Sequence, residues 1–197
     1  LGAAVSVADA FLEKGKIVYT EGRIKDAQLE FSAKPPDLLH GAPLVVLVNE
    51  GSASASEIVA GALQDRERAV IMGRPTFGKG SVQTILPMNN KTALKLTTAR
   101  YFTPSGRSIQ AEGISPDIVI DKLKVAASQS ASTDVVKEAN LNRHLDNQEG
   151  QPEKEGEKRA TEEDVDETSL AERDYELYEA LNLLKGMDLL HTRSSGP

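Results

Sequence analysis

Apolar residues between positions 43 and 63 change their spacing part-way along. Residues 43–48 form a continuous apolar run rich in β-branched side chains, which is too short for an ordinary helix and predicts a buried strand. After a Gly/Ser segment, helical spacing begins at Ala55 and predicts a buried helix of about three turns. The apolar positions of that helix are Ile58, Val59, Ala62 and Leu63. A strand, a glycine-containing turn and a helix therefore follow one another here.

The flanking sequence contains further elements of both kinds. Helical spacing predicts a helix over 1–12. Alternation predicts a hairpin of 82–86 and 92–98 around a turn at 88–91. Shorter segments read as strands at 16–20, 69–72 and 118–120, a turn at 21–23 and a loop at 33–37. Strands that alternate with helices predict an α/β core.

Beyond Asp121 the pattern becomes irregular. Residues 122–146 predict a partly helical extension, with one helix over 135–145. Residues 147–168 carry nine acidic and three basic side chains, a local charge of −6 out of the net −7, and predict a mobile linker. An amphipathic helix is predicted over 169–190, followed by a tail at 191–197, and its stripe consists of Leu170, Leu177, Tyr178, Leu181, Leu184 and Met187. That helix either packs on its own domain or docks onto another copy or a partner.

Composition excludes several classes of function. With the acidic linker set aside, the remaining charge is only −1, and no basic patch of the kind that binds nucleic acid is present. No apolar run approaches the roughly 20 residues that cross a bilayer, so no membrane span is expected. The chain has no cysteine and no cluster of histidines and carboxylates at ligand spacing, which indicates neither a metal nor a cofactor. The three histidines read as surface residues rather than as members of a catalytic triad: His40, His144 and His191.

The Gly/Ser turn between the strand and the helix has two interpretations. Such a turn can present a serine hydroxyl beside free backbone N–H groups, which is how a fold forms a nucleophile and an oxyanion hole together. Ser54 and Glu57 also have the spacing of a capping box, in which the hydroxyl only satisfies a backbone N–H of the helix. Ser52, Ser54 and Ser56 alternate, so the pattern alone does not select one of them as a nucleophile.

A lysine between two glycines follows at Lys79, and it too has a second interpretation. Residues 73–79 have the glycine spacing of a phosphate-binding loop. Gly80 stands where that loop needs Ser or Thr for Mg²⁺, and the β-like residues 82–87 follow where it needs a helix. Nucleotide binding is therefore disfavoured. A serine with a lysine base is a known variant of the Ser-His-Asp arrangement, and at this point it stays open beside the capping interpretation of Ser54.

Four segments, taken in order, resemble the carboxyl-terminal processing proteases, a family of tail-specific serine peptidases. They are 47–58 (LVNEGSASASEI), 73–83 (GRPTFGKGSVQ), 101–110 (YFTPSGRSIQ) and 113–117 (GISPD). The resemblance extends over at least residues 1–121. It implies that 1–121 forms the C-terminal half of a mixed-sheet α/β protease core, to which a C-terminal helical extension is added.

The resemblance assigns a Ser/Lys endopeptidase mechanism to particular residues. The nucleophile of the family falls on Ser54, its general base on Lys79, and the glutamine that orients the lysine on Gln83. A lysine acts as a base only when neutral, and burial in an apolar pocket lowers the pKa of a lysine. Lys79 is therefore expected to be buried, with Phe77 as cover. The backbone N–H of Ala55 is expected to be one oxyanion-hole donor, because it follows the nucleophile at a helix start.

The resemblance also implies features that lie outside this chain. Family members carry a PDZ domain and the first half of the catalytic domain upstream, so the chain is expected to be the C-terminal part of a longer enzyme. A glycine-rich loop of that half is expected to supply the second oxyanion N–H, and the PDZ domain to recognise substrate C-termini. The implied location is the periplasm. The implied partners are protein or peptide substrates, further copies in a homo-oligomer, and a protein activator or adaptor.

An alternative function of a different class remains. In that reading the chain is a non-catalytic module, in which the helix at 169–190 organises an oligomer or docks a regulator.

Overall fold

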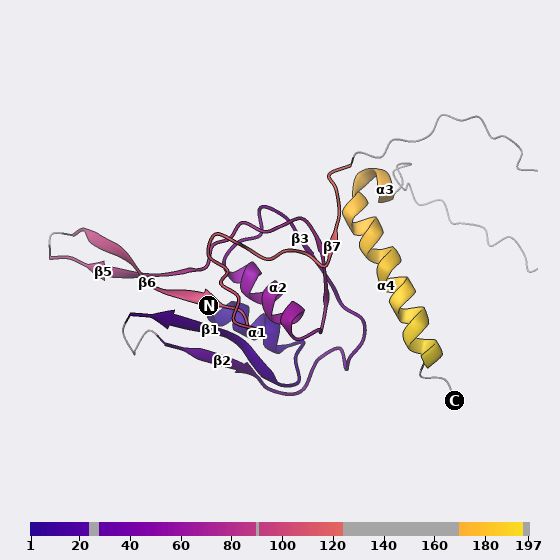
Figure 1. Cartoon of the computed structure of the whole chain (residues 1–197), viewed down its shortest axis with the longest axis horizontal. Coiled ribbons are helices and arrows are strands. Elements are labelled where there is room, and N and C mark those ends of the chain that lie inside the picture. Colours follow the sequence, from indigo (N-terminus) through magenta and orange to yellow (C-terminus); the bar gives the residue numbers. More distant parts are fainter. Residues whose placement is uncertain (24–27, 90, 124–169, 195–197) are drawn as a thin grey trace, which may run out of the picture.

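The computed structural model describes residues 1–23, 28–89, 91–123 and 170–194. In this part, an antiparallel sheet and a smaller parallel sheet enclose two helices, and a pair of C-terminal helices lies beside the parallel sheet (Figure 1). The α/β fold class is confirmed, with the two strand directions segregated into separate sheets. The helix predicted over 135–145 and the linker predicted over 147–168 fall outside the described residues.

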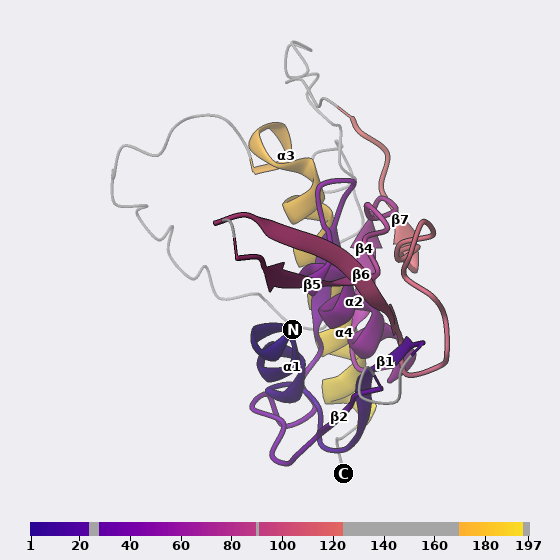
Figure 2. The ribbon, with the colours of Figure 1, turned by 90° about the vertical axis from the view of Figure 1, so that its left-hand side faces the viewer.

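The antiparallel sheet has four strands in the order β2-β1-β6-β5. Their bounds are Gly15–Gly22 for β1, Glu30–Ala33 for β2, Ser81–Pro87 for β5 and Ala93–Phe102 for β6. β6 pairs with β1 near its end, where Tyr19 faces Phe102, and the two rings stack with centroids 5.3 Å apart. The outer part of the β5–β6 hairpin extends away from the body, and in Figure 2 it comes toward the viewer.

The parallel sheet has three strands in the order β3-β4-β7. Their bounds are Val45–Val48 for β3, Val70–Gly73 for β4 and Ile118–Val119 for β7. Helix α2, Ala55–Asp65, joins β3 to β4. In sheets of this kind ligands bind beyond the carboxyl ends of the strands, so the turn after β3 and the segment after β4 are placed where a site can form.

The core lies where the two inner helices meet both sheets. α1, Gly2–Asp9, contacts β1, β2 and α2, while α2 contacts β1 of one sheet and β4 of the other. Gly61 allows α2 to approach a neighbouring loop, because a Cβ at this position would lie 2.8 Å from Thr103 and 2.9 Å from Ile114. The largest fully buried apolar side chains are Ile17, Leu63, Ile71, Ile109, Ile114 and Val18.

Several element boundaries differ from the sequence prediction. α1 ends at Asp9 rather than at residue 12, because Phe11 and Leu12 donate their N–H groups three residues back and tighten the chain. The turn predicted at 21–23 is wrong at its start, since β1 continues through Gly22. β6 extends beyond the predicted 92–98 to Phe102. β2 was not predicted at all; it is short and pairs with β1 across a register shift.

Residues 170–194 form two helices instead of the single one predicted over 169–190. They are α3, Leu170–Arg173, and α4, Tyr175–Ser194. The break falls at Asp174, whose carboxylate accepts the N–H of Leu177 at 2.9 Å and so caps the start of α4. Helix α4 includes residues 191–194, which the sequence analysis assigned to the tail.

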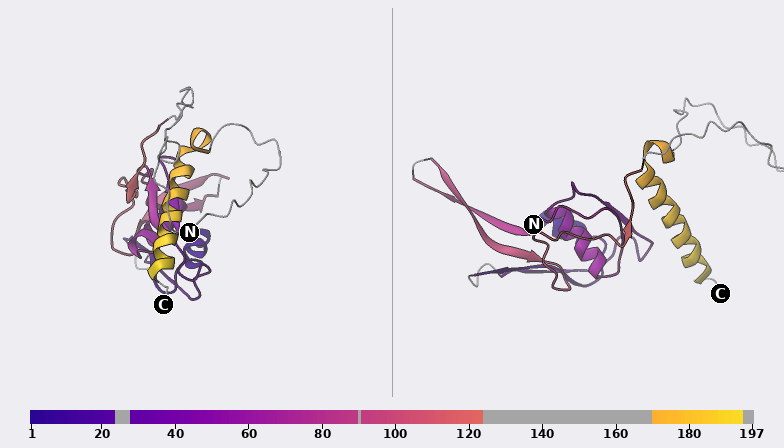
Figure 3. Two further views of the ribbon diagram at one scale, coloured as in Figure 1. Left: turned by 90° about the vertical axis from the view of Figure 1, so that its right-hand side faces the viewer. Right: turned by 45° about the horizontal axis from the view of Figure 1, so that its top comes forward.

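Helix α4 packs on the parallel sheet (Figure 3). Ala180 lies against Met72 and Ile120, where its small side chain lets the helix come close. Leu177, Tyr178 and Leu181 remain at least 37% exposed, so the predicted stripe is only partly used in this contact. Of the two predicted roles, packing on its own domain is the one observed.

Candidate active site

The turn after β3 engages one of the three alternating serines. The Ser52 hydroxyl accepts the N–H of Asn49 at 3.2 Å, and the Asn49 side chain accepts the N–H of Gly51 at 2.9 Å. The backbone N–H of Ser52 donates to the Asn49 carbonyl at 2.9 Å. The Ser52 side chain therefore stabilises the turn itself, a role that neither Ser54 nor Ser56 shares.

Ser54 occupies the junction between this turn and α2. It is the N-cap of α2 and has φ 56° and ψ −105°, a conformation that residues with a side chain rarely adopt. Such strain at a strand-to-helix turn is characteristic of residues that present a nucleophile. Ala55 is the first residue of α2, so its N–H is among those at the helix start that lack an intrahelical partner. Ser56 is an exposed residue of the first turn.

The segment after β4 alternates between inward and outward residues. Thr76, Gly78 and Gly80 are buried, whereas Phe77 and Lys79 are exposed, Phe77 by 67%. The expectation that Lys79 is buried under Phe77 is therefore wrong for the described residues. The reason is the alternation itself, because the inward positions are those that contact α2 and the loop at 109–114.

The two glycines beside Lys79 are required by that inward contact. A Cβ on Gly80 would lie 2.4 Å from the backbone nitrogen of Gln110, and Gly78 has φ +86°. Gly78 accepts the N–H of Ala111 at 2.9 Å, and Gly80 donates to the Gln110 side chain at 3.2 Å. The backbone therefore approaches closely on both sides of Lys79, and the neighbour on both sides is the loop at 109–114.

Glu57 joins the serine segment to the lysine segment. Its side chain is fully buried, at 0% exposure. Its carboxylate accepts the N–H of Ser54 at 2.7 Å, the hydroxyl of Thr76 at 2.6 Å, and the N–H groups of Gly78 and Lys79 at 2.6 and 2.9 Å. Ser54 and Lys79 are thus held by one side chain through their backbone N–H groups.

Gln83 lies further from this junction. It is an exposed residue of β5 that faces Thr97 of β6, and the pairing register shifts between Val82 and Gln83. Strand β5 begins only at Ser81, so Lys79 and Gln83 do not belong to one regular strand. Among the described residues, no hydrogen bond joins the side chains of Ser54, Lys79 and Gln83.

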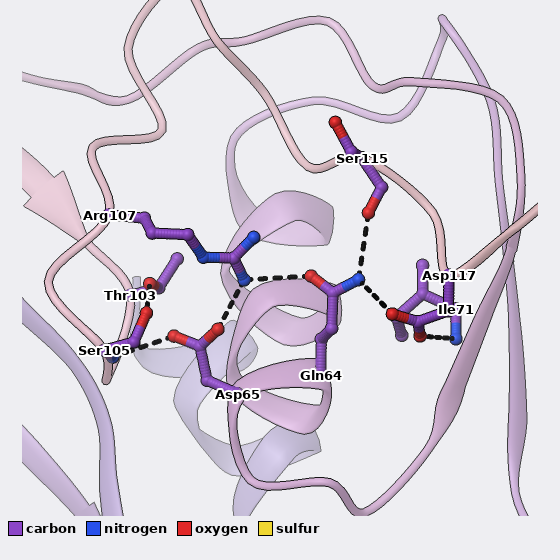
Figure 4. Close-up of polar contacts among 8 residues, drawn as sticks. All are labelled: Gln64, Asp65, Ile71, Thr103, Ser105, Arg107, Ser115 and Asp117. Atoms are coloured by element: carbon purple, nitrogen blue, oxygen red, sulfur yellow. Dashed lines mark hydrogen bonds and ion pairs between the residues drawn. The ribbon is translucent and has the colours of Figure 1, made fainter.

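The opposite end of α2 fixes the loops that support the lysine segment (Figure 4). Asp65 accepts the N–H of Ser105 at 2.8 Å and pairs with the Arg107 guanidinium. Gln64 accepts from Arg107 at 2.9 Å and donates to Asp117 at 2.7 Å. Burial raises the pKa of Asp65, but hydrogen bonds from Thr103, Ser105 and Arg107 outweigh it, so the pKa lies below its ordinary 3.8.

Sequence reasoning treated Glu57 only as a capping residue and missed its contacts with residues 76–79. A signal was present, because Glu57 stands one turn before Gly61 and beside Ile58 on the face of α2 that is otherwise apolar or small. A carboxylate on a buried helix face needs several donors, and the segment after the next strand is the nearest source of backbone N–H groups.

The described residues contain no group of three or more His, Cys, Asp or Glu side chains that could hold a metal ion. No helix among them is both long and apolar enough to cross a bilayer.

Comparison with known proteins identifies relatives of this chain. The chain is 60% identical over 122 residues to the carboxy-terminal-processing protease of Bartonella bacilliformis. The matched residues make up 62% of this chain and 28% of that protein. It is 40% identical over 132 residues to the carboxyl-terminal-processing protease of Synechocystis sp., covering 67% of this chain and 30% of that protein.

A solved structure of a processing protease also resembles this chain. The photosystem II D1 C-terminal processing protease superimposes with a TM-score of 0.57 at 40% identity, over 61% of this chain and 31% of that one. The chain therefore spans less than a third of the length of these three relatives. Because residues 1–120 match the family described as Peptidase family S41, the chain belongs to that peptidase family.

Proposed function

We propose that this chain carries the catalytic serine and lysine of a serine endopeptidase. Ser54 is the nucleophile, Lys79 the general base, and Gln83 the residue that orients the lysine. The backbone N–H of Ala55 is one donor of the oxyanion hole, and the second donor comes from outside the chain.

The observation that carries this proposal is the shared hydrogen-bond acceptor of Ser54 and Lys79. Their two N–H groups donate to the same oxygen, Oε2 of Glu57, at 2.7 and 2.9 Å. The two backbone nitrogens are thus within two hydrogen-bond lengths of each other. The choice of Ser54 over its neighbours is supported by its strained N-cap position and by the use of the Ser52 hydroxyl in the turn.

The chemistry follows from these roles. Neutral Lys79 accepts the hydroxyl proton of Ser54 as Oγ attacks a peptide carbonyl, and it returns that proton to the leaving amine. The N–H of Ala55 stabilises the oxyanion that develops on the carbonyl oxygen. Water then hydrolyses the acyl-enzyme with the same lysine as base. Desolvation of the lysine favours its neutral form, and we assign the apolar cover that this needs to the remainder of the longer protein.

Substrate class and location are proposed from the relatives. The curated relatives quoted above are named for processing at the carboxyl terminus. We therefore propose that the longer protein cleaves extracytoplasmic proteins, that an upstream PDZ domain recognises their C-termini, and that a bacterial form acts in the periplasm.

The test compares cleavage of an unfolded protein by the full-length protein and by its Ser54→Ala, Lys79→Ala and Gln83→Ala forms. Ser56→Ala and Lys95→Ala are matched controls, because Ser56 is an exposed serine two residues from Ser54 and Lys95 is an exposed lysine on the hairpin. We expect no cleavage by the first two variants and normal cleavage by the controls. Cleavage that survives Lys79→Ala would overturn the proposed mechanism.

A second candidate function, assembly through α4, is favoured by the apolar residues that this helix leaves uncovered. Leu177 and Leu181 are 38% and 37% exposed, and Leu189 and Leu190 are 58% and 68% exposed. Under this proposal, Leu177→Glu with Leu181→Glu lowers the molecular mass measured by light scattering while the melting temperature is retained. An unchanged mass would remove this candidate.

A further inference from the structure

We infer that Glu57 is a positioning residue that sets the distance between the backbone of the nucleophile and the backbone of the base. This inference rests on the proposed Ser/Lys mechanism and adds to it a residue that holds the two reacting segments in register.

Within the part of the chain that the structure describes, Glu57 is buried without a cationic partner. The side chain has 0% exposure, and none of the ion pairs among the described residues involves it. A carboxylate removed from water without a positive partner must be stabilised by hydrogen bonds. Here four donors converge on two oxygens, which matches the four acceptor positions of a carboxylate.

The four donors are divided equally between the two carboxylate oxygens of Glu57. Oε1 accepts from the Thr76 hydroxyl and the Gly78 N–H, while Oε2 accepts from the Ser54 N–H and the Lys79 N–H. One oxygen thus holds the lysine segment against α2, and the other joins the two residues of the proposed dyad directly. A displacement of either residue would lengthen a bond to Oε2.

The contacts of Glu57 go beyond those of a helix cap. Of the two reciprocal bonds of a capping box, only one involves the side chain of the third helical residue, and here it is the bond from the Ser54 N–H to the Glu57 carboxylate. The other three donors come from residues 76–79, which lie in a different segment of the chain. Capping therefore accounts for one of the four contacts and leaves the link to Lys79 unexplained.

The arrangement continues behind Glu57. Thr76 Oγ1 accepts the N–H of Ile114 at 2.7 Å, so its own proton is directed to Glu57. The backbone N–H of Thr76 donates to the Ile114 carbonyl at 3.2 Å. The lysine segment is therefore fixed on one side by the carboxylate and on the other by the loop at 109–114, which limits its movement relative to Ser54.

The amide variant Glu57→Gln tests this arrangement because it preserves shape. Gln has one acceptor oxygen and one NH₂ donor, so one of the two donor pairs loses its acceptor: the Thr76 O–H and Gly78 N–H in one orientation of the amide, or the Ser54 and Lys79 N–H groups in the other. A base displaced by about 1 Å reduces the rate on the order of 10²-fold. We therefore expect Glu57→Gln to lower kcat on that scale while KM changes little, because substrate contacts are unaltered.

The experiment measures kcat and KM of the full-length protein with a fluorogenic peptide, beside the circular dichroism melting curve of each variant. Asp37→Asn is the matched control, because Asp37 is another carboxylate buried to 3% exposure that accepts backbone N–H groups, those of Leu39 and Gly41. It pairs with Arg68, beyond the C-terminal end of α2. A purely structural role predicts lower melting temperatures and normal kcat for both variants.

Every outcome of this experiment either supports or overturns the positioning role of Glu57. A lower kcat in folded Glu57→Gln, with a normal kcat in Asp37→Asn, supports the positioning role. A parental kcat in folded Glu57→Gln, or an equal loss in Asp37→Asn, overturns it. If Glu57→Gln does not fold, Glu57→Asp keeps the charge but shortens the reach, and the same comparison of kcat applies. Cleavage that persists in Ser54→Ala would instead refute the proposed dyad, a result that is distinct from failure of Glu57 alone.

Discussion

The two ends of α2 hold their surroundings by different means. At the N-terminal end, Glu57 is fully buried and its partners are N–H and O–H dipoles. At the C-terminal end, Gln64 and Asp65 form a network with Arg107, whose side chain is 43% exposed. Water and a flexible guanidinium can replace a lost contact in the second case. In the first case every donor depends on one side chain, so geometry is fixed more tightly where the proposed chemistry takes place.

The largest effect is expected from the backbone that brings the two reacting segments together. Gly73 has φ +129°, and a Cβ there would lie 2.0 Å from the Val48 carbonyl oxygen, so Gly73→Ala forces the ends of β3 and β4 apart. We expect a loss of at least about 4 kcal/mol in the free energy of unfolding. Urea denaturation measures this loss.

The control for that substitution is Gly186→Ala. A Cβ on this glycine of α4 would meet nothing within 4 Å. The substitution should therefore raise stability by about 0.5 to 1 kcal/mol, as expected for a helix interior. Equal stability of the two variants would contradict the argument from close approach.

Removing the carboxylate at either end of α2 tests the comparison directly. Glu57→Ala leaves the N–H groups of Ser54, Gly78 and Lys79, which are buried or partly buried, without their acceptor, and we expect it to destabilise the protein by about 3 kcal/mol or more. Asp65→Ala should have a smaller effect, about 1 to 2 kcal/mol, because Arg107 can turn to water. Chemical denaturation of both variants gives the two values, and the reverse order would disprove the proposed difference.

A smaller change in stability is expected when the pH is lowered and Asp65 becomes protonated. The folded pKa of Asp65 lies below its ordinary 3.8, so its stabilisation is present above pH 3.8 and is lost as the pH falls through the folded pKa. The stability difference between the parent and Asp65→Asn should therefore shrink as the pH is lowered below 3.8. Thermal unfolding at several pH values measures it. A difference that stays constant would mean that Asp65 has no lowered pKa.

The smallest effect is expected from Glu50, which pairs with Arg74 at 2.9 Å but has a side chain that is 62% exposed. Hydrogen bonding lowers the pKa of Glu50, its own backbone N–H first and then Arg74. Solvent screens such a pair, so Glu50→Gln should leave the melting temperature unchanged within error. A clear decrease would show that exposed ion pairs matter as much here as buried dipoles.

Sequence patterns predicted the elements whose side chains have one dominant environment. The apolar run at 43–48 and the helical spacing from Ala55 correspond to β3 and α2. Boundaries were less accurate where the spacing of apolar residues does not decide them: β2 is defined by its pairing with β1, and Asp174 divides the C-terminal helix through a local capping bond to Leu177. The resemblance located Ser54 and Lys79, and their catalytic roles remain a prediction.

The exposure of Lys79 could not be read from the pattern. The prediction of burial followed from the chemistry that a neutral lysine needs, whereas its neighbours Gly78 and Gly80 turn inward because other backbone lies against them. Glu57 was underestimated for a related reason. Its capping role is visible within four residues of sequence, but its contacts with 76–79 appear only when β4 is placed beside β3.

The contacts of Glu57 also differ from those of the other end of α2 in the length of chain they enclose. Its bonds to residues 76–79 close loops of 19 to 22 residues, while those of Gln64 and Asp65 to residues 105–117 close loops of 40 to 53. A doubling of loop length adds about 0.6 kcal/mol of closure entropy. The β3–α2–β4 segment can therefore collapse around its buried carboxylate with less entropy loss, and we expect the serine–lysine junction to form before the 103–117 loop arrives during folding.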